Sequence, residues 1–305
     1  MINLGSCDYI DFEFVVQGQR EMNWTMIHFR QQLEFRYFQR DENCQGNYSF
    51  IGRSCVIEPV NYNEVTQIHL SFLDRSDQIS ISFVTNSNST LPQCQFGLTK
   101  DNLDRIVNGT TDRYEASDMC EGKANEIGPQ AYIDVGYLHR IILENLTSST
   151  IYYYRVGNDQ DGWSSIHQFR SRPQSNDETI HLIAYGDMGL APIQSGAKAT
   201  IDRVLNRSIE NDVRCILHIG DISYARGTGV LWDSFMYQIE ATASRFPYIV
   251  GIGNHEYDHL SGGDKDPSHA KGPGGFRPIW YSVISINFSR FHFFYIFRLK
   301  GRLWK

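Results

Sequence analysis

The alternation of apolar and polar residues divides the chain into two parts of different rhythm. Between about residues 65 and 172, short segments alternate apolar and polar positions, with turn residues between them. Such segments include QIHLSF (67–72), ISISFVTN (79–86) and TIYYYRVGN (150–158). Alternation with a period of two is typical of strands with one buried face, and several such strands at short spacing predict a β-sandwich.

The second rhythm begins after SRPQSNDET (171–179), a polar, proline-containing stretch that is typical of a linker. Three nearly continuous apolar runs follow it: IHLIAYGD (180–187), RCILHIGD (214–221) and FPYIVGIGNHE (246–256). Helical stretches at about 195–211 and 230–244 separate these runs. Strands that are apolar on both faces and alternate with helices predict a parallel sheet with right-handed crossovers.

We therefore expect three parts: a β-rich N-terminal extension at 1–61, a sandwich at 62–173 and an α/β domain at 179–305. The sandwich resembles a fibronectin III domain around LENLTSSTIYYYRVG, where Leu146 and Thr150 precede Tyr152. We expect Tyr152 to form a tyrosine corner, which is a structural role and not a catalytic one.

Composition excludes some classes of protein and favours others. The 305 residues are 41% hydrophobic and 21% charged, as in ordinary globular proteins, and the net charge of -7 argues against a general binder of nucleic acid or membrane surfaces. No run of 18 apolar residues is present, and the start MINLGSCDYIDFEF has no signal-peptide pattern. None of the six cysteines forms a CxxC pair, and the pairings Cys44–Cys55 and Cys94–Cys120 are both conceivable disulfides.

N-glycosylation sequons point to the secretory route. A chain this rich in Asn, Ser and Thr would contain roughly three by chance, but seven are present: Asn23, Asn47, Asn88, Asn108, Asn145, Asn206 and Asn287. We therefore expect a secreted glycoprotein whose natural N-terminus extends beyond this sequence.

Each of the three apolar runs ends in glycine followed by residues that can bind a ligand. They are Asp187 in GDMG, Asp221 and Tyr224 in GDISY, and Asn254 and His255 in GNHE. Because parallel strands end at one edge of their sheet, we expect these side chains to converge there. The simplest alternative is that each Asp only caps the helix that follows its strand.

Gathered carboxylates repel one another unless cations neutralise them. Two metal ions can share one bridging carboxylate at a separation of about 3.5–4 Å. We assign the bridge to Asp221, one ion to Asp187 and Tyr224, and the second ion to the amide oxygen of Asn254. Two carboxylates and a phenolate form a hard, anionic oxygen set that suits Fe(III).

The order GDxG, GDxxY and GNHE resembles the first three of five signature blocks of the purple acid phosphatases, within the calcineurin-like metallophosphoesterases. Most of that superfamily has DxH in the first block, whereas this chain has Asp187-Met188-Gly189. Residues 62–173 resemble the fibronectin III-like domain that precedes the catalytic domain in plant-type large members. RQQLEFRYF (30–38) resembles the N-terminal extension of the longest forms.

This resemblance implies a β-sandwich followed by an α/β metallophosphoesterase domain that hydrolyses phosphate monoesters at acidic pH. The implied cofactors are Fe(III) and a divalent ion, either Zn, Mn or Fe. Asp187, Asp221 and Tyr224 match the iron ligands, and Asn254 matches a ligand of the divalent ion that also lies at the substrate. His255 matches a catalytic His that contacts substrate. The resemblance further implies a secreted or vacuolar-lysosomal protein and a homodimer, with no nucleic-acid or membrane partner.

The sequence departs from the family after His255. Neither VxxH nor GHxH follows, although these blocks supply three metal-binding His in the family. We do not expect His259, His269 or His292 to replace them, and residues 267–305 contain no Asp or Glu. We therefore expect an incomplete, C-terminally truncated catalytic domain and an impaired enzyme. Two alternatives are a phosphodiesterase or nucleotide pyrophosphatase on the same scaffold, and a non-catalytic secreted glycoprotein.

Overall fold

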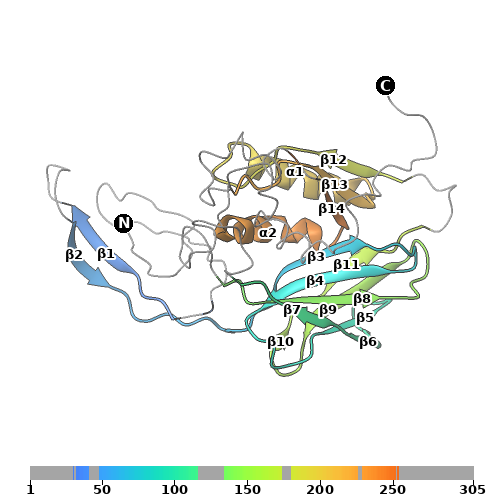
Figure 1. The fold of residues 1–305 in the computed structure, drawn as a ribbon, viewed down its shortest axis with the longest axis horizontal. Helices are drawn as coiled ribbons and strands as arrows, with labels where there is room; N and C mark the ends of the chain where they lie inside the picture. The colour runs from blue at the N-terminus through green and yellow to red at the C-terminus, as the bar shows by residue number, and fades with distance from the viewer. Residues whose placement is uncertain are drawn as a thin grey trace.

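The computed structural model describes residues 30, 32–40, 48–115, 134–173, 180–225, 229–251 and 253. Three parts are visible in Figure 1: a projecting hairpin, a two-sheet sandwich, and a layer of helices on a parallel sheet. None of the helices in these ranges is long and apolar enough to span a bilayer.

The hairpin consists of β1 (Arg36–Arg40) and β2 (Tyr48–Arg53), which pair antiparallel. A single bridge between Leu33 and Ile57 extends the pairing towards the sandwich. The last residues of the RQQLEFRYF stretch therefore lie in a β-strand.

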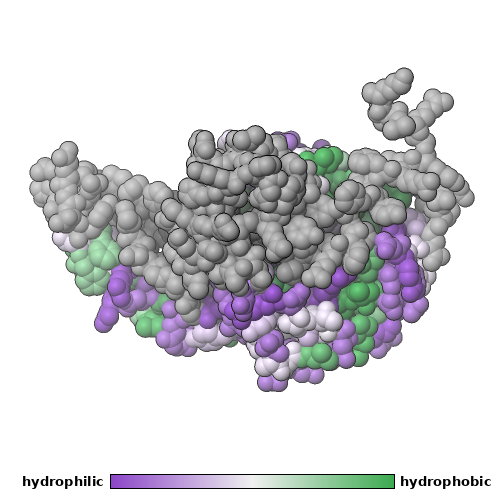
Figure 2. Space-filling view, in the orientation of Figure 1, coloured by the Kyte–Doolittle hydropathy of each residue, from purple (hydrophilic) through white to green (hydrophobic). Residues whose placement is uncertain are grey.

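The sandwich is built from two antiparallel sheets. One has the order β3 (Thr66–Phe72), β4 (Ile79–Thr85), β8 (Tyr137–Leu143) and β7 (Thr110–Asp112). The other has the order β10 (Gly162–Trp163), β9 (Ile151–Asn158), β5 (Gln93–Gly97) and β6 (Arg105–Asn108), with β11 (His167–Arg170) also paired to β9. The described outer surface on this side mixes hydrophilic residues with a few hydrophobic patches (Figure 2).

Tyr152 makes the contact expected of a tyrosine corner. Its side chain is 1% exposed, and its hydroxyl accepts a hydrogen bond of 2.9 Å from the backbone N–H of Thr147. Its ring stacks on Phe169 with the centroids 5.6 Å apart. The predicted structural role of Tyr152 is therefore confirmed.

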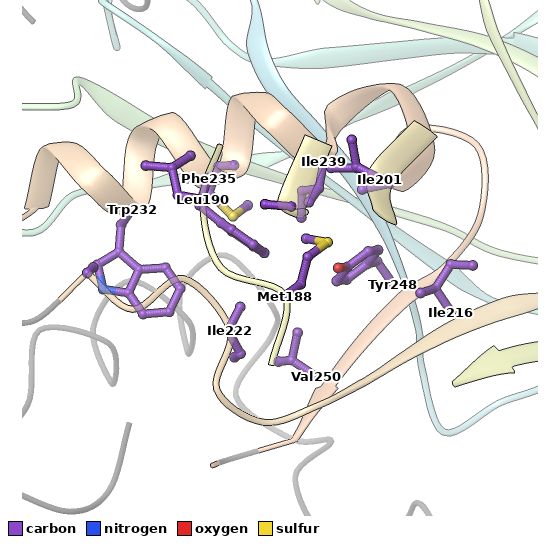
Figure 3. Close-up of a cluster of buried hydrophobic side chains, with 14 of the residues drawn as sticks. Met188, Leu190, Ile201, Ile216, Ile222, Trp232, Phe235, Ile239, Tyr248 and Val250 are labelled. Atoms are coloured by element: carbon purple, nitrogen blue, oxygen red, sulfur yellow. The ribbon is translucent and has the colours of Figure 1, made fainter. Parts of the chain in front are cut away.

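The α/β layer follows the predicted order. Its elements are β12 (Leu182–Tyr185), α1 (Ala197–Glu210), β13 (Cys215–Ile219), α2 (Gly229–Ala243) and β14 (Tyr248–Gly251). The three strands pair in parallel in the order β12-β13-β14. Buried apolar residues from the strands, the helices and the loops between them form one core (Figure 3).

Helix α2 lies between the parallel sheet and the sandwich (Figure 1). Val84 and Leu138 of the sandwich belong to the same buried cluster as the residues of α2. All seven residues of β4 are buried, because one face of this strand packs inside the sandwich and the other lies towards the α/β layer. The linker sequence alone did not predict this close packing.

The structure corrects the expected cysteine pairings. Cys55 and Cys94 are both free thiols, the first exposed and the second buried, so neither Cys44–Cys55 nor Cys94–Cys120 is formed. Cys94 lies among apolar side chains of the sandwich core, and burial raises the pKa of its thiol well above the usual range.

Replacing Tyr152→Phe will lower the free energy of unfolding by about 1–2 kcal/mol, because the Thr147 N–H loses its acceptor. Urea unfolding measures the change. Tyr153→Phe, on the same strand, is the matched control and is expected to stay within about 0.5 kcal/mol of the unsubstituted chain. Equal effects of the two substitutions would contradict the assignment.

Glu240 of α2 will make stability depend on pH. Burial raises its pKa to about 7 from an ordinary 4.5, although the N–H groups of Gln67 and Ile68 oppose the shift. Between pH 4.5 and about pH 7 the folded chain therefore binds one proton more than the unfolded chain does. The stability from this group is present below pH 4.5 and is lost as pH rises through 7.

Burial also lowers the pKa of His139 and His218 to about 4, so these residues make stability depend on pH as well. Their contribution is the same in Glu240→Gln and in the unsubstituted chain, and the difference between the two proteins therefore reports Glu240 alone. Between pH 5 and pH 8 the unsubstituted chain should lose about 2–3 kcal/mol of its free energy of unfolding relative to Glu240→Gln, because only the unsubstituted chain has to ionise a buried carboxyl group. Glu210→Gln, at the exposed end of α1, should show no such shift. A difference that stays constant with pH would refute the expectation.

Candidate metal centre

Three loops leave the carboxyl ends of β12, β13 and β14 at one edge of the sheet. The first two are hydrogen-bonded to each other: the Asp187 N–H donates to the Gly220 carbonyl at 3.2 Å, and the Gly189 N–H donates to the Ile222 carbonyl at 3.0 Å. This contact follows from the parallel pairing, because adjacent parallel strands carry their C-terminal loops side by side.

The loops bring three of the expected ligands together. The Tyr224 hydroxyl lies 3.2 Å from Asp187 Oδ1 and 3.3 Å from Asp221 Oδ2, close enough to donate a hydrogen bond to either carboxylate. Asp221 is buried, Tyr224 is half-buried and Asp187 is exposed. The three side chains thus face a common point, on which the sequence hypothesis depends.

The helix-cap alternative does not fit this geometry. Helix α1 begins at Ala197, with Gly196 as its N-cap and no side-chain cap. Helix α2 begins at Gly229, eight residues after Asp221. Neither Asp187 nor Asp221 therefore stands at the start of a helix.

All three residues have a left-handed backbone. Their φ angles are 56° for Asp187, 49° for Asp221 and 53° for Tyr224. Such angles are uncommon for residues other than glycine and cost of the order of 1–3 kcal/mol each when they are strained. Asp adopts them more readily than Tyr, so the conformation of Tyr224 is the most unusual. Backbone strain of this kind gathers at functional sites.

The third loop approaches Asp221 through Gly253. A Cβ added to Gly253 would lie 2.1 Å from Asp221 Oδ1 and 2.2 Å from the Asp221 backbone N. Only a glycine fits so close to a carboxylate, which is the role that the sequence predicts for the glycine of GNHE. Asn254 and His255 follow directly but lie outside the described residues, so their assignments stay predictions.

The electrostatics of the cluster favour a bound cation. Burial raises the pKa of the Tyr224 phenol well above its usual range, and the charges of Asp221 and Asp187 raise it further. The phenol therefore keeps its proton while the two carboxylates lie beside it. A hard cation would fit the three oxygens, because it would neutralise the carboxylates and displace that proton. The described part of the chain contains no group of three or more His, Cys, Asp or Glu that could hold a metal ion, so a three-oxygen site at these loops would need the Tyr224 phenol as its third donor.

Comparison with known proteins agrees with the fold. Residues 65–171 match the family model described as "Purple acid Phosphatase, N-terminal domain". "Probable inactive purple acid phosphatase 9" of Arabidopsis thaliana is 40% identical over 206 residues, which are 64% of this chain and 31% of that protein. A solved structure, purple acid phosphatase PPD1 from yellow lupin (Lupinus luteus) seeds, matches with a TM-score of 0.65 and 27% identity over 76% of this chain and 42% of that chain.

The chain belongs to the purple acid phosphatase family.

Other family relatives differ in the activity that their names state. Four relatives from Arabidopsis thaliana are named probable inactive purple acid phosphatases. A protein from Hordeum vulgare named "Nucleotide pyrophosphatase/phosphodiesterase" is 33% identical over 106 residues, which are 32% of this chain and 28% of that protein. The chain spans between 25% and 41% of the length of the four inactive-named relatives.

The structure also contains a contact near the centre that the sequence did not predict. Gln238 of α2 binds the loop that carries Asp187: its Oε1 accepts from the Ala191 N–H at 2.7 Å, and its Nε2 donates to the Gly189 carbonyl at 3.0 Å. No sequence signal distinguishes this Gln from any other polar residue of an amphipathic helix. His218, in contrast, is buried in the core and bonded to the Tyr248 hydroxyl at 3.0 Å, as its place within an apolar strand predicts.

Gly253→Ala will disturb the centre, because the added Cβ collides with both the carboxylate and the backbone of Asp221. We expect a loss of about 1–3 kcal/mol in the free energy of unfolding, as for overpacking in a core. The control is Gly251→Ala, at the end of β14, whose added Cβ would lie 3.7 Å or more from its neighbours. Thermal or urea unfolding measures the loss of stability in each variant. Equal losses in Gly253→Ala and Gly251→Ala would contradict the close approach of Gly253 to Asp221.

Proposed function

We propose that Asp187, Asp221 and Tyr224 form the iron side of a purple acid phosphatase centre that acts on phosphate monoesters. One observation carries the proposal: a phenol within 3.3 Å of two carboxylates, with all three residues in a left-handed backbone conformation. Two carboxylates and a phenol grouped in this way form a hard oxygen donor set that suits one hard cation.

The chain's residues have separate tasks in this proposal. Asp221 is buried and would hold both Fe(III) and a divalent ion, either Zn, Mn or Fe. Asp187 and Tyr224 complete the iron side, and Tyr224 gives up its proton on binding. Asn254 and His255 follow Gly253 and would hold the divalent ion and the substrate. When bound, the two ions would supply Lewis-acid stabilisation of the phosphoryl charge.

We further propose that this chain is impaired as a catalyst. Neither VxxH nor GHxH occurs between His255 and Lys305. The names of several relatives, which describe them as probable inactive phosphatases, support this part of the proposal.

Two other functions compete with this one. The barley relative supports a phosphodiesterase or nucleotide pyrophosphatase on the same scaffold. A non-catalytic secreted or vacuolar-lysosomal glycoprotein is supported by the sequons, because the four that lie in described residues, Asn88, Asn108, Asn145 and Asn206, are all exposed. In each case we propose a homodimer with no nucleic-acid or membrane partner.

Titration of the purified chain with Fe(III) tests the centre. We expect one Fe(III) per chain and a visible tyrosinate-to-iron absorption band, with release of the Tyr224 proton. Tyr224→Phe should abolish the band, and Asp221→Asn should weaken binding by at least about tenfold. Tyr237→Phe, an exposed position on α2, is the matched control and should leave both unchanged. A band that survives Tyr224→Phe, or no binding at all, would disprove the iron side.

Activity is measured on the chain loaded with Fe(III) and Zn(II). We expect hydrolysis of p-nitrophenyl phosphate at least about a hundredfold slower than by an intact family member, because a metal site that lacks ligands stabilises the transition state poorly. Bis(p-nitrophenyl) phosphate and ATP, as further substrates, separate the phosphodiesterase and pyrophosphatase alternatives. Full activity would refute the impairment.

A further inference from the structure

Two carboxylates of α2 contact one short segment of the sandwich. Glu240 Oε2 accepts from the Gln67 N–H at 2.9 Å, and the Ile68 N–H also hydrogen-bonds this carboxylate. Asp233 Oδ1 accepts from the Gln67 side-chain amide at 3.2 Å. Asp233 and Glu240 are seven residues apart, which is close to two helical turns, so both lie on the side of α2 that faces the sandwich.

The segment of the sandwich that they contact is irregular. The pairing of β3 with β4 shifts register between Thr66 and His69, and Gln67 inside this shift has a φ of 57°. A bulge of this kind turns successive N–H groups in one direction and creates a site for an anion. The carboxylate of Glu240 fills that site. The carbonyl of Gln67 is bonded in turn to Nδ1 of His69 at 2.9 Å.

The opposite side of α2 contacts the loops of the metal centre. Gln238 is two residues from Glu240, a rotation of about 200° around the helix, and it makes two hydrogen bonds to the loop that carries Asp187. Trp232 and Phe235 belong to the same buried cluster as Met188 and Ile222, the residues that follow the two ligand carboxylates (Figure 3).

We propose that α2 is a bridge by which the sandwich holds the two ligand loops in place, with Glu240 and Gln238 as positioning residues. The Glu240 side chain fixes the helix against the bulge of β3. Gln238 and the apolar side of the helix then fix residues 187–191 and 221–225. The sandwich would therefore act on the site without contributing a ligand to it. The effect of α2 on metal binding rests on the proposed function, whereas its effect on the order of residues 187–191 and 221–225 does not.

The bridge explains why an ionisable group lies in this interface. Glu240 is half-buried and its N–H partners stabilise its charge, but burial still raises its pKa to about 7. The titratable groups around it are Glu64, Asp233 and Tyr154, with Arg30 beside Asp233. An apolar residue would fill the space, yet it would leave the N–H groups of the bulge without an acceptor.

Hydrogen exchange on the full chain tests the bridge without any metal. Glu240→Ala should speed exchange of the N–H groups of residues 187–191 and 221–225 by about tenfold, while the core strand β4 stays protected. Glu240→Gln keeps an acceptor oxygen and should restore slow exchange at pH 6. Gln238→Ala should speed exchange in 187–191 alone. Glu210→Ala, at the exposed end of α1, is the matched control and should change neither loop.

Unchanged loops in Glu240→Ala, or faster exchange throughout the chain including β4, would overturn the proposal. If Glu240→Ala does not fold, Gln67→Asn replaces it in the same measurement. Asn tolerates a positive φ, but its side chain is too short to reach Asp233. The variant therefore keeps the backbone contact with Glu240, loses the second carboxylate contact between α2 and the bulge, and should speed exchange in both loops.

The Fe(III) titration separates this inference from the proposed function. If the unsubstituted chain binds Fe(III), Glu240→Ala should weaken binding by about tenfold and Glu240→Gln should restore it. If the unsubstituted chain binds no Fe(III), the proposed function fails, and the exchange measurement still decides whether α2 is the bridge.

Discussion

Parallel pairing of β12, β13 and β14 is the constraint on which the site depends. Tyr185 lies beside His218, and His218 lies beside Val250, so the three strands end at one level of the sheet. Each strand is followed by a glycine-containing turn that leaves room for the neighbouring loop. Because of this register, Asp187 and Asp221, which are 34 residues apart in the sequence, share a single phenol.

The sheet alone would not hold the loops, because the three strands make few contacts with the residues that follow them. Helix α2 supplies the missing contacts on two sides. It buries Met188 and Ile222 against its apolar side and presents carboxylates to the sandwich on the other. The Tyr154 hydroxyl adds a third connection, to the Ser244 carbonyl at 2.5 Å, just beyond the end of the helix. Fold and site are therefore connected through one element.

The parts that the sequence predicts are those with a local signal. Period-two alternation locates the sandwich strands, Tyr152 follows a recognisable pattern, and glycine before Asp marks the ends of the parallel strands. The bulge at Gln67, its carboxylate partner Glu240 and the contacts of Gln238 have no such signal. The contacts of Gln67 join residues 173 and 166 apart, and those of Gln238 join residues 47 and 49 apart. Each of these residues is an ordinary polar residue in its own segment. The cysteine pairings failed for the same reason, since spacing in the sequence does not report distance in the fold.

The conformation of the centre is informative because several of its features cost free energy. Two carboxylates lie beside a phenol whose pKa is raised by burial and by their charge, and three backbones are left-handed. A helix cap would have given Asp187 or Asp221 a simpler role, but the helices begin eight or more residues later. Packing around Ile222 and the Gln238 contacts make the folded chain keep this arrangement. A site with this conformation would be preorganised, because the folded chain already groups the three oxygens.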